Sequence, residues 1–184
     1  TLFLEFQGSS RAALKDDLKL VEEICAGCER LEAGIGREER DRLWEARHLI
    51  HDTIRTAFPG VGGIVADVAV PISGYPEIVK FSKEALHRHG LEGYVFGHAG
   101  SGNLHVEILY RPGSESEQRH AEAASEEIVH HALDLEGTAT GEHGVGLGKR
   151  KFMEKEHGES LELMSKIKEM LDPNGIMNPG KIFP

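Results

Sequence analysis

GYVFGHAGSGNLHVEILY, residues 93–110, holds two apolar runs on either side of a glycine-rich turn. Two such runs joined by a short connection are typical of a β-hairpin. Glycine tolerates the backbone angles that a sharp turn requires, and His98 and His105 stand at the two ends of this turn. The sequence therefore predicts two antiparallel strands, with His98 ending the first and His105 beginning the second, so that the two imidazoles face each other.

Helices and two more strands are expected around this hairpin. Thr1–Gly8 alternates in the manner of a strand, and residues 63–71 form a buried apolar run. The expected helices, the first capped by Ser9 or Ser10, cover about residues 9–33, 38–57, 76–90, 114–134 and 158–171. This order predicts an α+β fold, a largely antiparallel sheet covered by helices in a ferredoxin-like sandwich. No linker interrupts residues 1–184, so we expect one domain.

The composition argues against several classes of function. The chain has 21 Lys and Arg against 31 Asp and Glu, a net charge of −10. This balance disfavours nucleic acid and anionic membrane surfaces, because both bind through clustered cations. No apolar run approaches the roughly 20 residues that a membrane span needs. Two cysteines do not suggest a secreted disulfide scaffold, so we expect a reducing, cytoplasmic setting.

His98 and His105 form the first candidate site. Residues directly opposite on paired strands lie about 5 Å apart, close enough for two imidazoles to share one metal ion. The alternative is a glycine turn flanked by two hydrogen-bonded histidines that bind no metal. The hairpin pattern alone leaves both interpretations open.

The second candidate site is GEHGVGLGK, residues 141–149. A carboxylate from Glu142 would complete a His, His, Glu ligand set with an open fourth position, a recurring pattern in catalytic zinc sites. His143 would then be available as a base. A phosphate-binding loop is excluded, because Arg150 rather than Ser or Thr follows Lys149. A structural loop with a surface Glu–His pair is the alternative.

Three segments, in this order, resemble one family: GHAGSGNLH (97–105), GEHGVGLGKR (141–150) and DPNGIMNPGKIFP (172–184). They are similar to the C-terminal half of FAD-linked D-2-hydroxyacid dehydrogenases of the vanillyl-alcohol-oxidase type. The stretch at 66–86, ADVAVPISGYPEIVKFSKEAL, most resembles the D-lactate dehydrogenase (cytochrome) branch. The glycolate oxidase FAD-linked subunit is the other close resemblance. The resemblance implies a substrate, or cap, domain over residues 1–184 and an N-terminal FAD-binding domain that this chain lacks.

The resemblance implies a metal site and a base. His98, His105 and Glu142 match the family's ligands for a divalent metal, zinc or manganese, with iron able to use the same ligands. His143 matches the base that takes the proton of the substrate hydroxyl. On this view the metal lowers the pKa of that hydroxyl.

Two further matches concern the substrate and the flavin. Arg47, in LWEARH, matches the arginine that holds the substrate carboxylate, and Asn178, in NPGK, matches a segment near the flavin. The chain departs from the family at two positions. Ser101 stands where the hairpin usually carries Asp, and Val65 stands where the 2-hydroxyglutarate type has Lys. Without that cation, a short monocarboxylate is the favoured substrate.

The function implied is part of an FAD-dependent enzyme that oxidises D-lactate or glycolate to the 2-oxoacid by hydride transfer to the flavin. Expected partners are the acid, the polypeptide's own FAD domain and an electron acceptor such as a cytochrome, a quinone or a flavoprotein. A partner would also attach it peripherally at the inner membrane. Two other classes stay open: a metal-dependent hydrolase that uses the same His, His, Glu site, and a non-catalytic domain with a structural metal.

Overall fold

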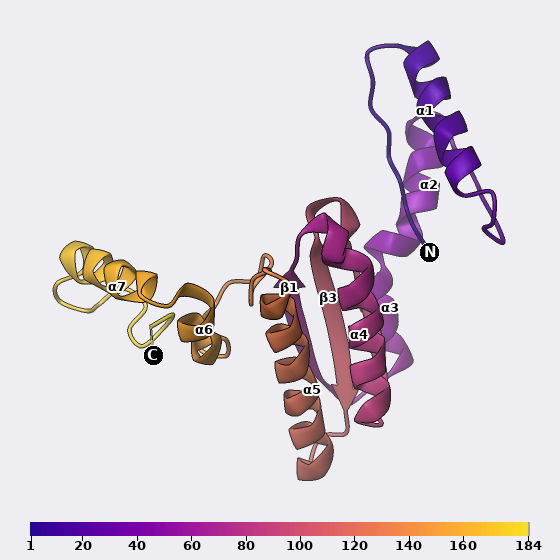
Figure 1. Ribbon diagram of the computed structural model, residues 1–184. Coiled ribbons are helices and arrows are strands. Elements are labelled where there is room, and N and C mark those ends of the chain that lie inside the picture. The colour runs from indigo at the N-terminus through magenta and orange to yellow at the C-terminus, as the bar shows by residue number, and fades with distance from the viewer. Residues whose placement is uncertain (184) are drawn as a thin grey trace. The chain divides into compact units, whose positions relative to one another are not determined.

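A computed structural model describes residues 1–183 (Figure 1). The contacts within the chain divide it into two compact units, Thr1–Pro59 and Gly60–Pro184. The sequence predicted one domain without an internal boundary. None of the helices in residues 1–183 is both long and apolar enough to cross a membrane.

The first unit consists of three helices, α1 (Arg11–Ile24), α2 (Arg37–His48) and α3 (Ile50–Ala57). The expected serine cap is confirmed, because the Ser10 hydroxyl accepts a hydrogen bond from the backbone N–H of Ala13 at 3.2 Å. The first helix ends well before residue 33, and Leu49 divides the helix expected over 38–57 into α2 and α3.

The strand predicted over residues 1–8 is wrong. No strand forms there, and Leu2, Leu4 and Phe6 are exposed. A strand exists only where a neighbour takes up its backbone hydrogen bonds. Within residues 1–183 no strand pairs with this segment, so its alternation of residue types is not enough to make it a strand.

The second unit is built on an antiparallel sheet of β1 (Gly62–Ala69), β2 (Gly93–His98) and β3 (Asn103–Tyr110). The strand order is β1-β3-β2, with both pairs antiparallel. Helix α4 (Tyr75–Arg88) connects β1 to β2, and α5 (Glu115–Asp134) follows β3. The structure thus confirms an α+β fold with an antiparallel sheet.

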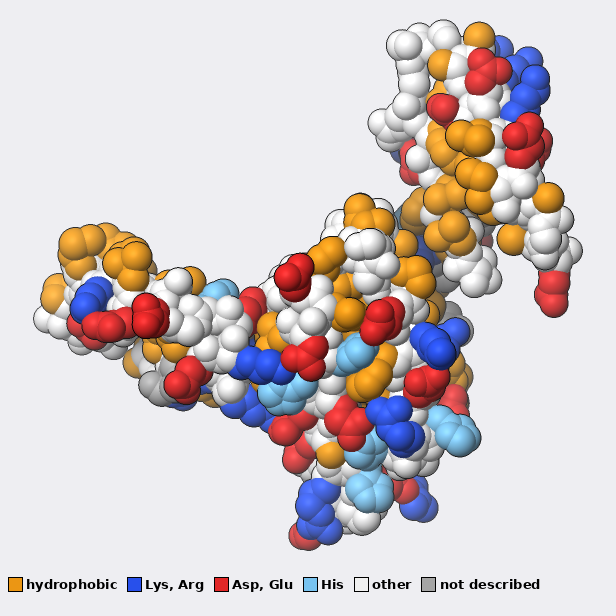
Figure 2. Space-filling view, viewed as in Figure 1, with side chains coloured by type: hydrophobic (Ala, Val, Ile, Leu, Met, Phe, Trp, Pro, Cys, Tyr) orange, Lys and Arg blue, Asp and Glu red, His pale blue; other side chains and the backbone are white. Residues whose placement is uncertain are grey.

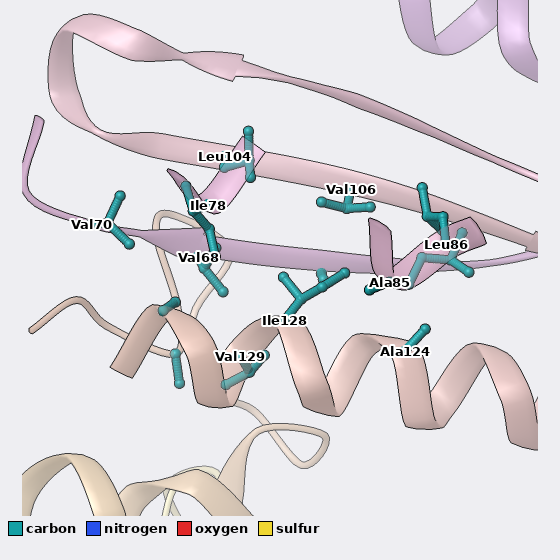
Figure 3. Close-up of a cluster of buried hydrophobic side chains, with 14 of the residues drawn as sticks. Val68, Val70, Ile78, Ala85, Leu86, Leu104, Val106, Ala124, Ile128 and Val129 are labelled. Atoms are coloured by element: carbon teal, nitrogen blue, oxygen red, sulfur yellow. The ribbon is translucent and has the colours of Figure 1, made fainter. Parts of the chain in front are cut away.

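Helices α4 and α5 pack together and against the sheet, and apolar side chains fill the space between (Figure 3). Burying a large aliphatic side chain contributes about 1.5–3 kcal/mol, so this layer supplies much of the stability of the unit. The buried core includes Ala66, Val68, Val70, Ile78, Ala85, Leu86, Leu104, Val106, Ile108, Ala124, Ile128 and Val129.

The other face of the sheet is polar. Successive side chains of a strand point to opposite faces, so Asp67, His105 and Glu107 point away from the apolar core. Each of them is nevertheless at most 5% exposed. Buried polar groups need partners. A cluster of them on one face of the sheet makes this face a candidate for a functional site.

The outer surface of α4 and α5 carries histidines and charges of both signs (Figure 2). Ion pairs link the two helices there. Glu127 of α5 lies 2.8 Å from both Arg88 of α4 and His89, the residue that ends α4. The His131 ring stacks on Phe81 with 3.9 Å between centroids. These histidines therefore serve helix packing.

The C-terminal part contains α6 (Met153–His157) and α7 (Ser160–Leu171). The last helix was expected from residue 158. Gly158 instead separates the two helices with a positive φ of 51°, which glycine adopts at little cost.

Gly102, in the turn between β2 and β3, has a φ of +76°, and a Cβ placed on it would lie 1.9 Å from the carbonyl oxygen of Val70. We expect Gly102→Ala to destabilise the protein by at least about 2 kcal/mol, because strain and a backbone clash add. Gly100→Ala is the matched control, since a Cβ there meets nothing within 4 Å. Chemical denaturation measures both. Equal stabilities for the two variants would contradict this account of the turn.

Candidate metal centre

The hairpin brings His98 and His105 together, but in a different register from the one expected. His98 is paired with Asn103, and His105 with Phe96. The two histidines are therefore diagonal neighbours instead of facing each other. Their rings still approach to 5.7 Å between centroids, at 89° to one another. The difference of two residues in register keeps both side chains on one face of the sheet, and diagonal neighbours are within reach of long side chains.

Glu142 joins the two histidines from the loop that follows α5. Its Oε1 lies 2.9 Å from Nε2 of His105. One ligand atom from each of His98, His105 and Glu142 lies within 4.8 Å of the others. His98 and Glu142 are exposed and His105 is buried, so the cluster has one side anchored in the sheet and one side open to solvent.

The donor chemistry of this cluster fits a divalent cation. Two imidazole nitrogens and one carboxylate form a ligand set found in zinc sites with an open position. A histidine must be neutral to ligate. Burial lowers the pKa of His105, an effect that the carboxylates of Asp67 and Glu142 only partly oppose. His105 is thus kept in the form that a metal requires.

A second group of metal-ligating side chains shares His105. Ligand atoms of Asp67, His105 and His143 also lie within 4.8 Å of one another. The rings of His105 and His143 are stacked, 5.1 Å apart and inclined by 11°. His105 is therefore a member of both candidate triads: its Nδ1 lies nearest Asp67, and its Nε2 lies nearest Glu142.

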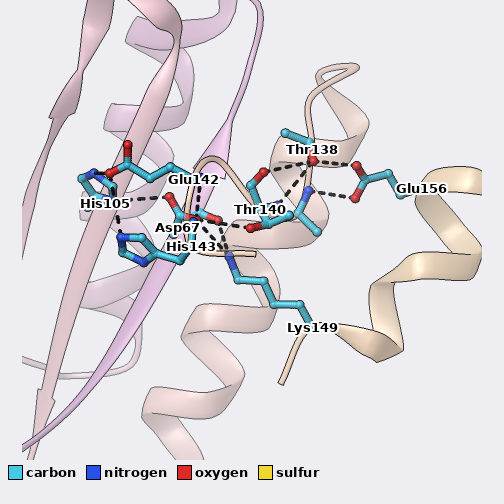
Figure 4. A network of polar contacts seen from close by, with 9 residues as sticks. Asp67, His105, Thr138, Thr140, Glu142, His143, Lys149 and Glu156 are labelled. Atoms are coloured by element: carbon cyan, nitrogen blue, oxygen red, sulfur yellow. Dashed lines mark hydrogen bonds and ion pairs between the residues drawn. The ribbon is translucent and has the colours of Figure 1, made fainter. Parts of the chain in front are cut away.

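Asp67 fixes the loop that carries Glu142 and His143 (Figure 4). It lies on β1 with no exposed surface. Its Oδ2 accepts the backbone N–H groups of Glu142 and His143, at 3.0 and 2.9 Å. The ammonium of Lys149 lies 3.3 Å from the same oxygen and donates to the Asp67 carbonyl at 2.6 Å.

These contacts keep the Asp67 carboxylate charged. Burial by itself would raise the pKa of Asp67, but the two backbone donors and Lys149 outweigh it and hold the pKa below the ordinary value. Burial in turn lowers the pKa of Lys149, and the charge of Asp67 opposes that shift. The buried carboxylate of Asp67 and the partly buried ammonium of Lys149 therefore form an ion pair in which each charge stabilises the other.

The loop also approaches the sheet very closely. A Cβ added at Gly141 would lie 2.3 Å from Oδ1 of Asn103 and 2.8 Å from Oδ1 of Asp67. Glu156 of α6 holds the start of the loop, accepting the Thr138 hydroxyl at 2.6 Å and the Ala139 N–H at 2.9 Å. Glycine at 141 is what allows the backbone to reach the carboxylate.

Arg47 and Asn178 are not placed in this cluster. Arg47 lies on α2 in the first unit, and Asn178 lies in the C-terminal turn with a left-handed φ of 47°. Asparagine tolerates this conformation better than most residues. Roles in substrate and flavin binding stay predictions for both.

Two residues of the site, Asp67 and Lys149, were given no role from the sequence. The signal for Asp67 was a carboxylate between Ala66 and Val68 in an otherwise apolar strand. The signal for Lys149 was a cation at the end of a glycine-rich run, the first of three in succession with Arg150 and Lys151. A buried strand that contains a charge predicts a partner for that charge, but the pattern does not say which.

Comparison with known proteins now decides the family. A family model described as "FAD linked oxidases, C-terminal domain" matches residues 1–182. The chain belongs to this family. The resemblance stated from the three motifs is confirmed, and FAD is the cofactor that membership implies.

The relatives extend this result. The chain is 40% identical to the D-lactate dehydrogenase [cytochrome], mitochondrial, of Arabidopsis thaliana, over all of this chain and 33% of that protein. It is 38% identical to the enzyme of the same name from Kluyveromyces lactis, over all of this chain and 32% of that protein. It is 33% identical to the glycolate oxidase subunit GlcD of Bacillus subtilis, over 91% of this chain and 36% of that protein. The chain thus spans about a third of the length of these relatives.

A solved structure shows the same fold. The 4-ethylphenol oxidase of Gulosibacter chungangensis aligns with a TM-score of 0.64 over 95% of this chain and 38% of its own. The sequence identity is 17%. At this level the likeness concerns the fold alone.

Asp172 orders the turn that leads to Asn178. Its two carboxylate oxygens accept the N–H groups of Ile176 and Met177, at 3.0 and 2.8 Å. Lys168 pairs with the same carboxylate. The hydrogen bond from Lys168, followed by those two N–H groups, lowers the pKa of Asp172 against the opposing effect of burial.

We expect Asp172→Asn to lower the melting temperature at pH 7. A carboxyl with a lowered pKa in the folded state stabilises the protein above the unfolded value of about 4, and this contribution disappears as the pH falls through the folded value. The gap between wild type and variant should therefore stay constant above about pH 4 and shrink as the pH falls below it, in thermal melts followed by circular dichroism. Asp16→Asn, on the exposed surface of α1, is the control. A gap that stays constant with pH would show that charge on Asp172 is not the cause.

Proposed function

We propose that residues 1–184 form the substrate domain of an FAD-dependent dehydrogenase that oxidises a short D-2-hydroxyacid, D-lactate or glycolate, to the 2-oxoacid. The observation that carries this proposal is the convergence of His98, His105 and Glu142 in a chain of the FAD-linked oxidase family. The printed names of the relatives support the choice of acid. The FAD-binding domain would belong to another part of the polypeptide.

The topology supports a further detail of the fold. A β1-α4-β2-β3-α5 order with a β1-β3-β2 sheet is that of a ferredoxin-like sandwich without its last strand. We include this architecture in the proposal. It places the cluster on the sheet face that is not covered by α4 and α5.

In the proposed reaction the metal, zinc or manganese, would supply Lewis acidity toward the C2 hydroxyl, and FAD would supply the hydride acceptor. His98, His105 and Glu142 would hold the metal. His143 takes the hydroxyl proton while C2 gives up its hydride, so that the carbon–oxygen double bond forms. The side chain of His143 is 51% exposed, which leaves it accessible to a substrate.

Arg47 binds the substrate carboxylate in this proposal, because a guanidinium can hold a carboxylate through two hydrogen bonds. Asn178 lies close to the flavin. Val65, in place of a cation, limits the substrate to one carboxylate. The word cytochrome in the names of two relatives supports a cytochrome as the electron acceptor, ahead of a quinone or a flavoprotein.

The other two classes of function have less support. A hydrolase would use the same ligands, but membership of an FAD-linked oxidase family supports oxidation. A structural metal would need a closed set of ligands, whereas His98 and Glu142 are exposed. The cytoplasmic location stays a prediction. The names of the relatives from Arabidopsis thaliana and Kluyveromyces lactis do not support it, because both are called mitochondrial.

We expect the full-length polypeptide to contain about one divalent ion per chain and His105→Ala to contain none. His105 is the buried member of the cluster, so its loss removes the anchored ligand. Mass spectrometry of the purified proteins measures the metal. The matched control is His120→Ala, on the exposed surface of α5, which should keep the ion. Wild-type protein without metal would refute the site.

In the full-length enzyme we expect His143→Asn to lower kcat for D-lactate by about 10²–10⁴-fold, the usual worth of a general base. Arg47→Lys should mainly raise KM, because a single ammonium replaces a two-pronged contact. Steady-state kinetics with an artificial electron acceptor measures both. Residues 1–184 alone should show no turnover. Unchanged kinetics in both variants would remove these two residues from the mechanism.

A further inference from the structure

Two buried polar atoms of the candidate metal centre have no hydrogen bond of good geometry. They are Oδ1 of Asp67 and Nδ1 of His105. The two residues are directly opposite each other on β1 and β3, and these atoms lie 3.4 Å apart. Leaving two such atoms unpaired is costly. A small rotation of the ring would join them as an N–H donor and a carboxylate acceptor.

We propose that Asp67 is a positioning residue that holds His105 in the tautomer with its proton on Nδ1, and that Lys149 keeps Asp67 charged for this task. The inference rests on the proposed metal site. An ionised carboxylate only accepts hydrogen bonds, so the imidazole nitrogen that faces Asp67 must carry the proton. The lone pair of a neutral ring is then on Nε2, the nitrogen that lies 2.9 Å from Glu142 and faces the cluster.

Glu142 competes with Asp67 for the proton of His105, and its environment makes it the weaker competitor. The side chain of Glu142 is 49% exposed, whereas that of Asp67 is fully buried. Water can satisfy the Glu142 carboxylate. Oδ1 of Asp67 has no other donor, so the Nδ1–H tautomer gives this buried oxygen a partner and leaves the Nε2 lone pair of His105 for the metal.

The same contacts show why Asp67 is not itself a metal ligand, although it belongs to a triad with His105 and His143. In the proposed tautomer its Oδ1 faces the Nδ1–H of His105, and its Oδ2 already faces two backbone N–H groups and the ammonium of Lys149. A divalent cation placed there would be repelled by the partly buried ammonium of Lys149. We therefore expect the chain to hold one ion, with Nε2 of His105 as a ligand, and His143 would then not ligate a metal.

Asp67 in addition sets the position of a ligand and of the proposed base. The backbone N–H groups of Glu142 and His143 both donate hydrogen bonds to its Oδ2. In Asp67→Asn an amide group replaces one oxygen and the charge is lost, so the ring and the loop lose a shared acceptor. Removing a partner that orients a metal ligand typically weakens metal binding 10–100-fold, and we expect a loss in this range.

The test uses the full chain labelled with ¹⁵N-histidine, and Zn²⁺ as the only added ligand. The ¹⁵N chemical shifts of His105 identify the protonated nitrogen. We expect Nδ1–H in the wild type, both without zinc and with it, and at least partial conversion to the other tautomer in Asp67→Asn. Competition with a chelator gives the zinc dissociation constants. Asp134→Asn is the matched control, the same substitution in an exposed ion pair with Lys155, and should bind as the wild type does.

Each outcome separates this inference from the proposed function. Nε2–H in the zinc-free wild type, or wild-type zinc affinity in Asp67→Asn, overturns the role of Asp67 and leaves the metal site standing. Two zinc ions per chain overturn the exclusion of Asp67 as a ligand. A wild type that binds no zinc refutes the metal site. In that case the tautomer of His105 still tests whether Asp67 accepts a hydrogen bond from its Nδ1. Should Asp67→Asn fail to fold, the wild-type tautomer decides in the same way.

Discussion

The site depends on one buried carboxylate. Asp67 lies on β1, an outer strand of the β1-β3-β2 sheet. On the polar face it accepts hydrogen bonds from the loop that carries Glu142 and His143. Without a charge-compensating partner, such a group would be too costly to bury. Lys149 supplies that partner. The sheet, the loop and the lysine all contact this carboxylate. Asp67 therefore fixes where the loop places Glu142 and His143 relative to His105.

The sheet serves two purposes through its two faces. One face packs on α4 and α5 through aliphatic side chains and stabilises the unit. The other carries Asp67 and His105 on β1 and β3, where the register of the strands fixes their spacing. A functional group on a central strand is held more rigidly than one on a loop. This explains how a buried histidine can anchor ligands that are themselves exposed.

Much of this arrangement could be predicted from the sequence, because much of it is local. The glycine-rich turn, the serine cap of α1 and the apolar pattern of residues 63–71 are properties of short segments, and all three appear in the structure. The three candidate ligands were found from spacing and from the family resemblance. The structure brings them within reach of one another.

What could not be predicted is not local. The diagonal placement of His98 and His105 depends on strand register, which the turn and the packing set together. The segment Thr1–Gly8 has the alternation of a strand but no paired neighbour in the part of the chain that the structure describes. Asp67 could be seen as a charge in an apolar strand, but its partners lie far away in the sequence.

That distance has a consequence for folding. Asp67 and the backbone of Glu142 are 75 residues apart in the sequence, and the hairpin with the two histidines lies between them. Contacts of such long range close a large loop, and their entropic cost is met only when the intervening elements have already packed. The cluster is therefore among the last parts of the unit to assemble, and the capacity to bind a cation would report on completion of the fold.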